Sequence, residues 1–463
     1  MNPELQRNLW LEATPRRVAW VVVALALVLG AVGVVTGMGG ENARDVGRAL
    51  AVTGGVIFVV SALLWGSREA GQAVMEEIGA RTWEFQRLSA LTPWTMTWGK
   101  LFGATSVAWM AALVGLTFAA ADRAVDQGAA SAMLFVISGV AAGVIFHAVA
   151  MSSALIGVRK ARAEGRLATL RGSVFGLIFL LVLVWVVSGA VGGRGGGFDF
   201  LAGDAPVVWF GESFPRDGFV AASLALFAAW AVSGAWRLMR LELQTRNAAW
   251  WWPAFLVFAA VWAAGLASGA AEAWLAAFAI FVAGSYVSAF AEPADRIRLR
   301  QFAGSLPRGD VERTATLTPA VVPALLLAVI AAIGLTVVGS ESSSTLVQSG
   351  NDAREVLNRA LRDDATPAFA LLAFLIRDLG VIAFFRFGAR PRRGDFGAVV
   401  ALGLLYLVGG ALGSAFGDSV GGALFFPHPD QPIVSLISAA LQAFLIWTLA
   451  ARRIAGPDRP ANA

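Results

Sequence analysis

Apolar runs of about 20 residues recur from one end of the chain to the other and constrain its fold more than any other feature. A helix of that length and composition crosses the hydrocarbon core of a bilayer. Only 14% of the 463 residues are charged and the mean hydropathy is +0.69, whereas about a quarter of the residues in a soluble domain are charged. The sequence therefore predicts an all-α, polytopic helical membrane protein embedded in a lipid bilayer.

Twelve runs have the length and composition of a span. They lie at residues 17–38, 47–66, 94–121, 129–157, 172–193, 218–239, 250–268, 272–291, 319–340, 367–388, 396–416 and 432–451. Four starts pair a threonine with proline, which predicts a hydroxyl N-cap followed by the first helical position. These pairs are Thr14-Pro15, Thr92-Pro93, Thr318-Pro319 and Thr366-Pro367.

The distribution of basic residues orients the spans. If both termini lie on one side, that side holds 27 of the 36 Lys and Arg residues, the other side holds 8, and Arg377 lies inside a span. Because lysine and arginine concentrate in cytoplasmic loops, we expect both termini and the loops at 67–92 and 292–318 to be cytoplasmic. Few lysines beside abundant alanine, glycine and arginine indicate a GC-rich bacterial genome. The expected location is the bacterial cytoplasmic (inner) membrane.

The stretch EEIGARTWEFQRLSALTPWTMTWGK (76–100) interrupts the apolar runs with charges of both signs. Read as a helix, residues 78–91 separate an apolar side from a charged side. The apolar side holds Phe85, Leu88 and Leu91, and the charged side holds Glu77, Arg81 and Glu84. An interfacial helix on the lipid surface is one interpretation, but such a helix is expected to be mainly basic. A short two-signed helix held between two spans suits a contact with another protein.

The chain reads as two halves, residues 1–240 and 241–463, with the same order of features. The segments EIGARTWEFQRLSAL (77–91) and EPADRIRLRQFAGSL (292–306) align without a gap and share four residues. Chance similarity among low-information membrane segments is the alternative explanation. A duplication predicts about twelve spans in two six-helix repeats of one orientation, related by an axis along the membrane normal.

The first of these segments resembles the coupling segment of type 2 permeases of ATP-binding-cassette exporters. In that family the segment reads roughly Glu…Gly-Thr-Leu-Glu…Leu…Thr-Pro…Gly-Lys. The matching positions here are Glu77, Thr82, Glu84, Leu88, Leu91, Thr92, Pro93, Gly99 and Lys100. Arg81 and Trp83 replace a glycine and a leucine of the family pattern. The second half lacks the Thr-Pro and Gly-Lys pairs at matching positions, and a typical family member has six spans and forms dimers.

The resemblance implies a coupling helix that sits in a groove of a separate ATPase subunit. Its residues would be Glu77, Arg81, Thr82, Trp83, Glu84, Phe85, Leu88 and Pro93. It also implies an amphipathic helix at 3–17, ahead of the first span, and short re-entrant helices at 195–218 and 416–432. The expected function is the transmembrane permease subunit of an exporter, which couples ATP hydrolysis by two copies of a partner ATPase to movement of a substrate.

The chain itself carries no catalytic constellation, so we expect it not to be an enzyme. No Gly-x-x-x-x-Gly-Lys-[Ser/Thr] motif occurs, so ATP would have to be bound by the partner and no cofactor is expected here. Histidine occurs only at His147 and His428 and cysteine is absent, which argues against a metal site. The arginines are scattered through short loops and form no single stripe, which argues against nucleic acid as a partner.

Arg377 and Asp378, in FLIRDLGVIAF, are the ionisable residues expected at membrane depth, where a charge costs about 2.5–3.5 kcal/mol. Two roles are open for them: a polar clamp between helices, or part of a substrate pathway. His147, in the fourth span, is either a hydrogen-bonded packing residue or a substrate contact. A twelve-span secondary transporter is the main alternative function, and a polytopic membrane enzyme is the lesser one.

Overall fold

The computed structural model describes residues 2–40, 42–80, 91–163, 205–245, 250–342, 366–388, 394–415, 420–428 and 431–456. The elements of the first part of the chain are α1 (Pro3–Glu12), α2 (Pro15–Met38), α3 (Ala43–Phe58), the π-helix η1 (Val59–Gly66), α4 (Ser67–Gly79), α6 (Pro93–Trp98), the π-helix η2 (Gly99–Ala104), α7 (Ser106–Gln127), α8 (Ala129–Ala163), β1 (Val207–Trp209), β2 (Glu212–Phe214) and α11 (Arg216–Glu242). Those of the second part are α12 (Trp251–Gly265), α13 (Ala270–Ala291), α14 (Arg296–Ser305), the 3-10 helix η3 (Leu306–Arg308), α15 (Val311–Leu317), α16 (Val321–Ser342), α18 (Thr366–Arg386), α19 (Gly394–Ala415), α20 (Val420–Ala423) and α21 (Pro432–Ala455).

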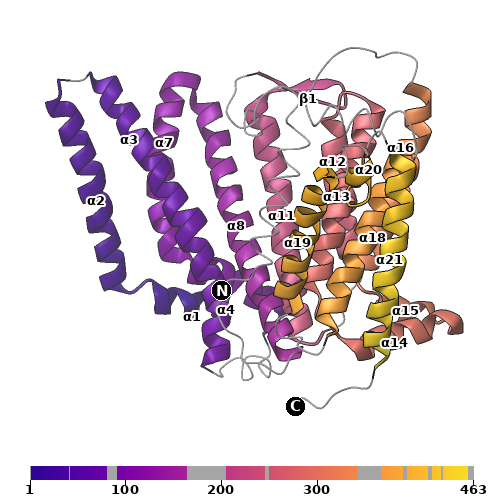
Figure 1. Ribbon diagram of the computed structural model, residues 1–463. Helices are drawn as coiled ribbons and strands as arrows, with labels where there is room; N and C mark the ends of the chain where they lie inside the picture. The colour runs from indigo at the N-terminus through magenta and orange to yellow at the C-terminus, as the bar shows by residue number, and fades with distance from the viewer. Residues whose placement is uncertain are drawn as a thin grey trace.

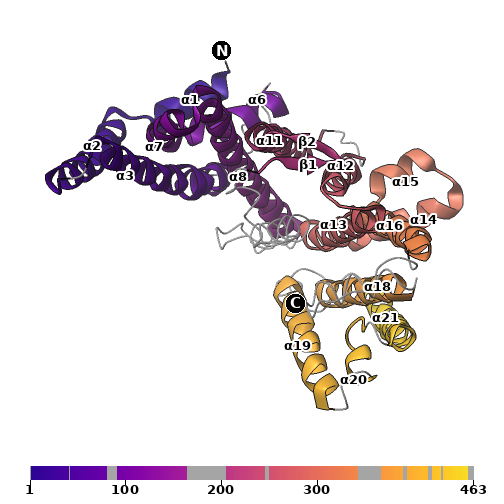
Figure 2. The same cartoon turned by 90° about the horizontal axis from the view of Figure 1, so that it is seen from above.

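The long helices stand side by side, and the short ones lie at their ends (Figure 1). We call the lower end in Figure 1 the basal end; it carries α1, α14, α15 and the last turn of α21. The β1–β2 hairpin lies at the opposite end. Seen along the bundle, α2 lies at one edge, while α18 to α21 form a group beside α13 and α16 (Figure 2).

Ten helices in the described part of the chain are long and apolar enough to cross a membrane, which fits a multi-pass membrane protein. They coincide with ten of the twelve predicted spans. The predicted span at 250–268 is α12, whose 15 residues extend about 22 Å, less than the roughly 30 Å of a hydrocarbon core. The predicted span at 172–193 lies outside the described residues. The arrangement in two six-helix repeats stays a prediction.

Two of the four predicted threonine caps are confirmed. Thr14 accepts a hydrogen bond from the Arg17 N–H, at the start of α2, and Thr92 accepts one from the Thr95 N–H at 3.2 Å, at the start of α6. The prediction for Thr318 is wrong, because its hydroxyl donates at 2.7 Å to a carbonyl in the last turn of α15. The helix α16 begins only after that residue and its proline.

Residues 207–214, within the segment 195–218 expected to contain a short re-entrant helix, form an antiparallel hairpin. Residues 195–204 of that segment lie outside the described residues. Phe210 and Gly211 make its turn, with φ of 49° and 82°, and two-residue hairpin turns favour such positive values. The hairpin packs on the end of α12, where the Phe210 N–H donates to the Gly265 carbonyl at 2.7 Å. A Cβ on Gly265 would lie 2.1 Å from Trp209 Nε1, so this contact requires glycine. The other expected outer segment contains the short α20 and is described only in part.

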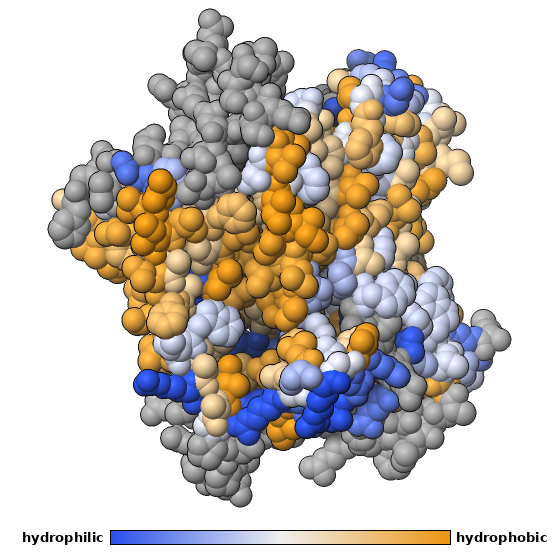
Figure 3. All heavy atoms as spheres, turned by 90° about the vertical axis from the view of Figure 1, so that its right-hand side faces the viewer, coloured by the Kyte–Doolittle hydropathy of each residue, from blue (hydrophilic) through white to orange (hydrophobic). Residues whose placement is uncertain are grey.

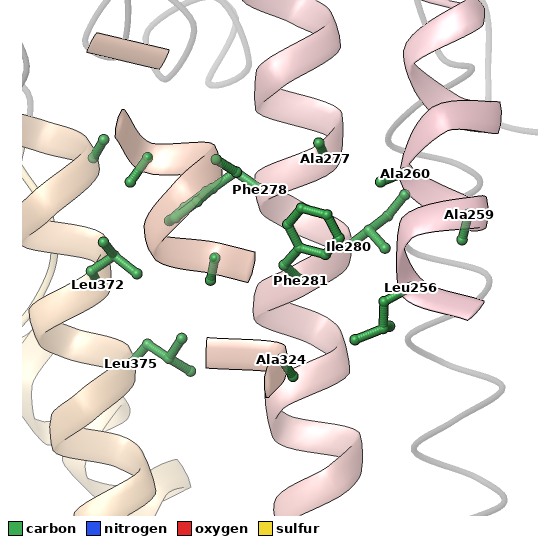
Figure 4. Close-up of a cluster of buried hydrophobic side chains, with 14 of the residues drawn as sticks. Leu256, Ala259, Ala260, Ala277, Phe278, Ile280, Phe281, Ala324, Leu372 and Leu375 are labelled. Atoms are coloured by element: carbon green, nitrogen blue, oxygen red, sulfur yellow. The ribbon is translucent and has the colours of Figure 1, made fainter. Parts of the chain in front are cut away.

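The largest buried cluster joins α12, α13, α16 and α18 (Figure 4). On α16 it is made by small residues, since Ala324, Ala328, Ala331 and Ala332 are all fully buried. Phe278 and Phe281 of α13 belong to the same cluster. Small residues on one helix let the neighbouring helix approach closely, which is how helices pack where lipid removes the hydrophobic driving force between them.

The outward faces of the long helices are apolar. On the face shown in Figure 3, apolar residues cover the middle of the molecule and hydrophilic residues gather along the lower edge. Leu326, Ile330 and Ile333 of α16 are each about half exposed or more, at 58%, 54% and 49%. A soluble protein rarely exposes so large an apolar area, so this surface fits contact with lipid.

The crossing of α3 and α7 yields a stability prediction. A Cβ on Gly54 would lie 2.4 Å from the Gly115 carbonyl oxygen, whereas a Cβ on Gly55 would meet nothing within 4 Å. Gly54→Ala should therefore destabilise the chain by about 1–3 kcal/mol through overpacking. Gly55→Ala should be neutral or mildly stabilising, because alanine favours a helix over glycine by about 1 kcal/mol. Thermal unfolding in an uncharged detergent, followed by tryptophan fluorescence, measures both; equal effects would contradict this crossing.

Candidate functional site

The helix α1 lies at the basal end with its polar side against the bundle. Glu4 and Asn8, one helical turn apart, are only 3% and 7% exposed, whereas Trp10 and Leu11 are 74% and 60% exposed. The helix predicted ahead of the first span is therefore present. Trp10 and Leu11 face outward, and the side with Glu4 and Asn8 lies against the rest of the protein.

Two glycines of η2 let the backbone of α1 approach the base of the third predicted span. A Cβ on Gly99 would lie 2.6 Å from Glu4 Cγ, and a Cβ on Gly103 would lie 2.7 Å from Asn8 Cβ. The Asn8 side chain donates to the Gly99 carbonyl at 3.4 Å. Any side chain at these two positions would push α1 away, which is a structural reason for the glycine of the Gly99-Lys100 pair.

Lys100 is completely buried and is neutralised by two carboxylates. Its Nζ lies 2.9 Å from Glu4 Oε1 and also donates to Glu77. Arg7 bridges the same carboxylates, with its Nη2 3.0 Å from Glu4 Oε1 and in contact with Glu77. We call Glu4, Arg7, Glu77 and Lys100 the basal charge cluster. Its formal charges cancel, which the buried members Glu4 and Lys100 require; Arg7 is partly exposed.

The electrostatics of the basal charge cluster keep Glu4 ionised. Burial acts to raise the pKa of its carboxyl, because it penalises the charged form. The charge of Lys100 and its hydrogen bond, together with the charge of Arg7, outweigh burial and hold the pKa of Glu4 below its usual value. Breaking a buried ion pair costs about 3–5 kcal/mol, because it leaves the other charge uncompensated. Separating α1 from the bundle would therefore cost this free energy.

Two of the predicted coupling residues lie in the described part of the chain. Glu77 belongs to the basal charge cluster, and Pro93 is the first residue of α6. The others, Arg81, Thr82, Trp83, Glu84, Phe85 and Leu88, lie outside the described residues. Ile78 and Leu91, on either side of them, pack against one buried cluster formed by α4, α6, η2, α8 and α11. The described residues on both sides of this segment thus pack against the same core.

Arg377 and Asp378 lie buried in α18, at 2% and 1% exposure, and pair with each other. Nε and Nη2 of Arg377 each lie 2.8 Å from Asp378 Oδ1. Nη1 donates to Gln442 Oε1 of α21 at 3.1 Å and to the Phe425 carbonyl at 3.4 Å. The ring of Tyr406 on α19 lies 5.0 Å from the guanidinium carbon. The pair therefore joins three helices inside the bundle.

Asp378 is also the acceptor for both tyrosines of the chain. Tyr286 of α13 donates to Oδ2 at 2.7 Å, and Tyr406 donates to the same atom at 2.6 Å. Sequence reasoning missed both. Their rarity could have indicated them: the chain has 30 phenylalanines and only 2 tyrosines, so each ring hydroxyl is an exception among its aromatic residues. We call Tyr286, Arg377, Asp378, Tyr406 and Gln442 the α18 polar network.

His147 lies in α8 in the arrangement of a packing residue. It is fully buried, with Nε2 2.7 Å from the Ala62 carbonyl of η1. A Cβ on Gly66 would lie 2.2 Å from the same nitrogen, and the Trp109 ring meets the imidazole edge-on. Among the described residues, no group of three or more His, Cys, Asp or Glu could hold a metal ion.

No protein-family model, curated protein or solved structure matches the chain. The resemblance to type 2 permeases therefore stays a prediction, carried by residues 77–100. The function has to be inferred from the basal charge cluster and the α18 polar network.

The α18 polar network yields a prediction about folding. Arg377→Leu or Asp378→Leu alone leaves one buried charge unpaired, which should cost about 3–5 kcal/mol, whereas the double replacement should recover much of that loss. The measurements are the monodisperse yield after extraction and the midpoint of thermal unfolding. A double variant no better than the worse single variant would contradict a clamp. A double variant that folds well but is inactive would assign the pair to mechanism.

Proposed function

We propose that the chain is the transmembrane permease subunit of an ATP-binding-cassette exporter. The observation that carries the proposal is the basal charge cluster, which joins α1, the end of α4 and the base of the third predicted span. These elements surround the two ends of the 81–90 segment, which resembles the family's coupling helix. A contact made by that segment would act on all three elements together.

The segment is connected to the spans by the continuous chain and by ion pairs. Residue 91 leads into α6 and η2, and η2 is followed by α7. Glu77 and Lys100 join α4 to η2, and Glu4 joins both to α1, which leads into α2. Packed elements joined by buried ion pairs move together, because separating them leaves uncompensated charge. Movement at 81–90 would therefore reach the first three predicted spans.

The proposal includes the orientation and the partner. The basal end would face the cytoplasm of a bacterium, as the excess of arginine indicates. Two copies of a separate ATPase would bind there and supply the nucleotide site. Residues 1–240 and 241–463 would form two six-span halves of one pore, with the second half keeping the layout but not the coupling motif.

A secondary transporter is the second candidate, because Asp378 is a carboxylate buried within a candidate span. Carriers driven by protons or sodium need ionisable groups at membrane depth. The two tyrosine hydroxyls and Arg377, however, all stabilise a fixed carboxylate. That arrangement favours a clamp over a carboxylate that binds and releases an ion.

The proposal predicts that truncating the aromatic residues of the coupling segment releases the ATPase. Trp83→Ala with Phe85→Ala should weaken the partner's binding roughly thirtyfold, since buried aromatic anchors typically cost about 2 kcal/mol or more. The measurement is co-purification of a co-expressed ATPase subunit with the tagged chain in detergent. Thermal unfolding of the chain alone should be unchanged.

The matched control is Trp250→Ala, which removes a tryptophan that is 58% exposed and lies outside the segment. This variant should retain the ATPase. Undiminished co-purification of the Trp83/Phe85 double variant would reduce the segment to an ordinary interfacial helix and remove the basis of the permease proposal.

A further inference from the structure

A pocket lined mainly by arginine and small residues opens in the α14–η3–α15 hairpin. Its volume is about 260 Å³. The lining residues are Arg300, Gln301, Gly304, Ser305, Arg308, Asp310 and Arg313. Three guanidinium groups and one carboxylate therefore surround one space, which gives it a formal charge of +2.

Two of the three guanidinium groups of this pocket, those of Arg308 and Arg313, lack a carboxylate partner within the described part of the chain. Neither Arg308 nor Arg313 forms a side-chain ion pair with any described residue. Asp310 uses its Oδ1 to accept the Arg313 N–H at 3.0 Å, as the N-cap of α15. Arg300 donates to the Ile454 and Gly456 carbonyls, at 3.0 and 2.7 Å, so it ties the hairpin to the end of α21. The pocket is thus held in place, and the charges of Arg308 and Arg313 exceed that of Asp310.

The hairpin projects sideways from the basal end, beside α16 and α21 (Figures 1 and 2). Hydrophilic residues gather along this lower edge, directly below the apolar surface of the long helices (Figure 3). Exposed apolar side chains accompany the arginines on the hairpin: Ile297 is 58%, Leu306 56% and Val311 79% exposed. Basic and apolar side chains together at this level match the headgroup region of a bilayer.

We propose that this pocket binds the phosphate of an anionic phospholipid headgroup. Arg308 and Arg313 would donate to the phosphate oxygens, since guanidinium groups form strong, paired hydrogen bonds to phosphate. Ile297, Leu306 and Val311 would lie against the upper acyl chains. An acidic protein partner fits the arginines but gives no reason for these exposed apolar side chains beside the lipid-facing surface of α16.

The test compares phosphatidylglycerol, phosphatidylcholine and inorganic phosphate as additions to the full chain in an uncharged detergent. The readouts are the midpoint of thermal unfolding and the number of lipids retained in native mass spectrometry. Arg308→Ala with Arg313→Ala should weaken phosphatidylglycerol binding about thirtyfold, because the variant removes two basic residues that each attract an anionic headgroup. Its unfolding midpoint without lipid should be unchanged, because both side chains are exposed.

The control variant, Arg16→Ala with Arg68→Ala, removes two exposed arginines outside the pocket and makes the same change in net charge. It should bind phosphatidylglycerol like the parent chain, and phosphatidylcholine should give no comparable effect. Equal loss in both variants would mean attraction by overall charge and overturn the site. An equal response to inorganic phosphate would assign the pocket to free phosphate, and unchanged lipid binding in the Arg308/Arg313 variant would also overturn the proposal.

Discussion

The buried ammonium of Lys100 is the constraint on which the basal part of the structure depends. A charge that is fully removed from water needs partners close by, and they come from Glu4 at the start of the chain and from Glu77 at the end of α4. This need explains why α1 turns its polar side inward. It also explains why Gly99 and Gly103 leave space for α1 at the base of the third span.

The helix α18 meets the same constraint with different groups. In α18 a guanidinium and a carboxylate pair inside the bundle, and the hydroxyls of tyrosines from two other helices donate hydrogen bonds to that carboxylate. Charges also join helices at the basal end, where Lys160 of α8 donates to Asp395 of α19 and, at 2.8 Å, to the Phe290 carbonyl of α13. Arg386 pairs with the same aspartate at 3.0 Å. Paired charges therefore connect α8 to α19 and α18.

Features that depend on local composition could be predicted from the sequence. Ten spans followed from run length and hydropathy, and Arg377 stood out because charges are rare in apolar runs. The inward polar side of α1 could not be predicted, since Glu4 and Lys100 are 96 positions apart and their pairing is tertiary. Neither could the two tyrosine donors, because a hydroxyl in an apolar run carries no periodic signal. The hairpin at 207–214 was missed because glycine and aromatic residues suit both a turn and a short re-entrant helix.

A charge exchange between Glu4 and Lys100 tests most directly whether a buried ion pair fixes α1 to the bundle. Glu4→Lys or Lys100→Glu alone places like charges together and should cost about 3–5 kcal/mol, with loss of hydrogen-exchange protection over 3–12. The double exchange restores an opposite pair and should recover most of the stability and the protection. Single variants as stable as the parent, or a double variant no better than the worse single variant, would contradict the account.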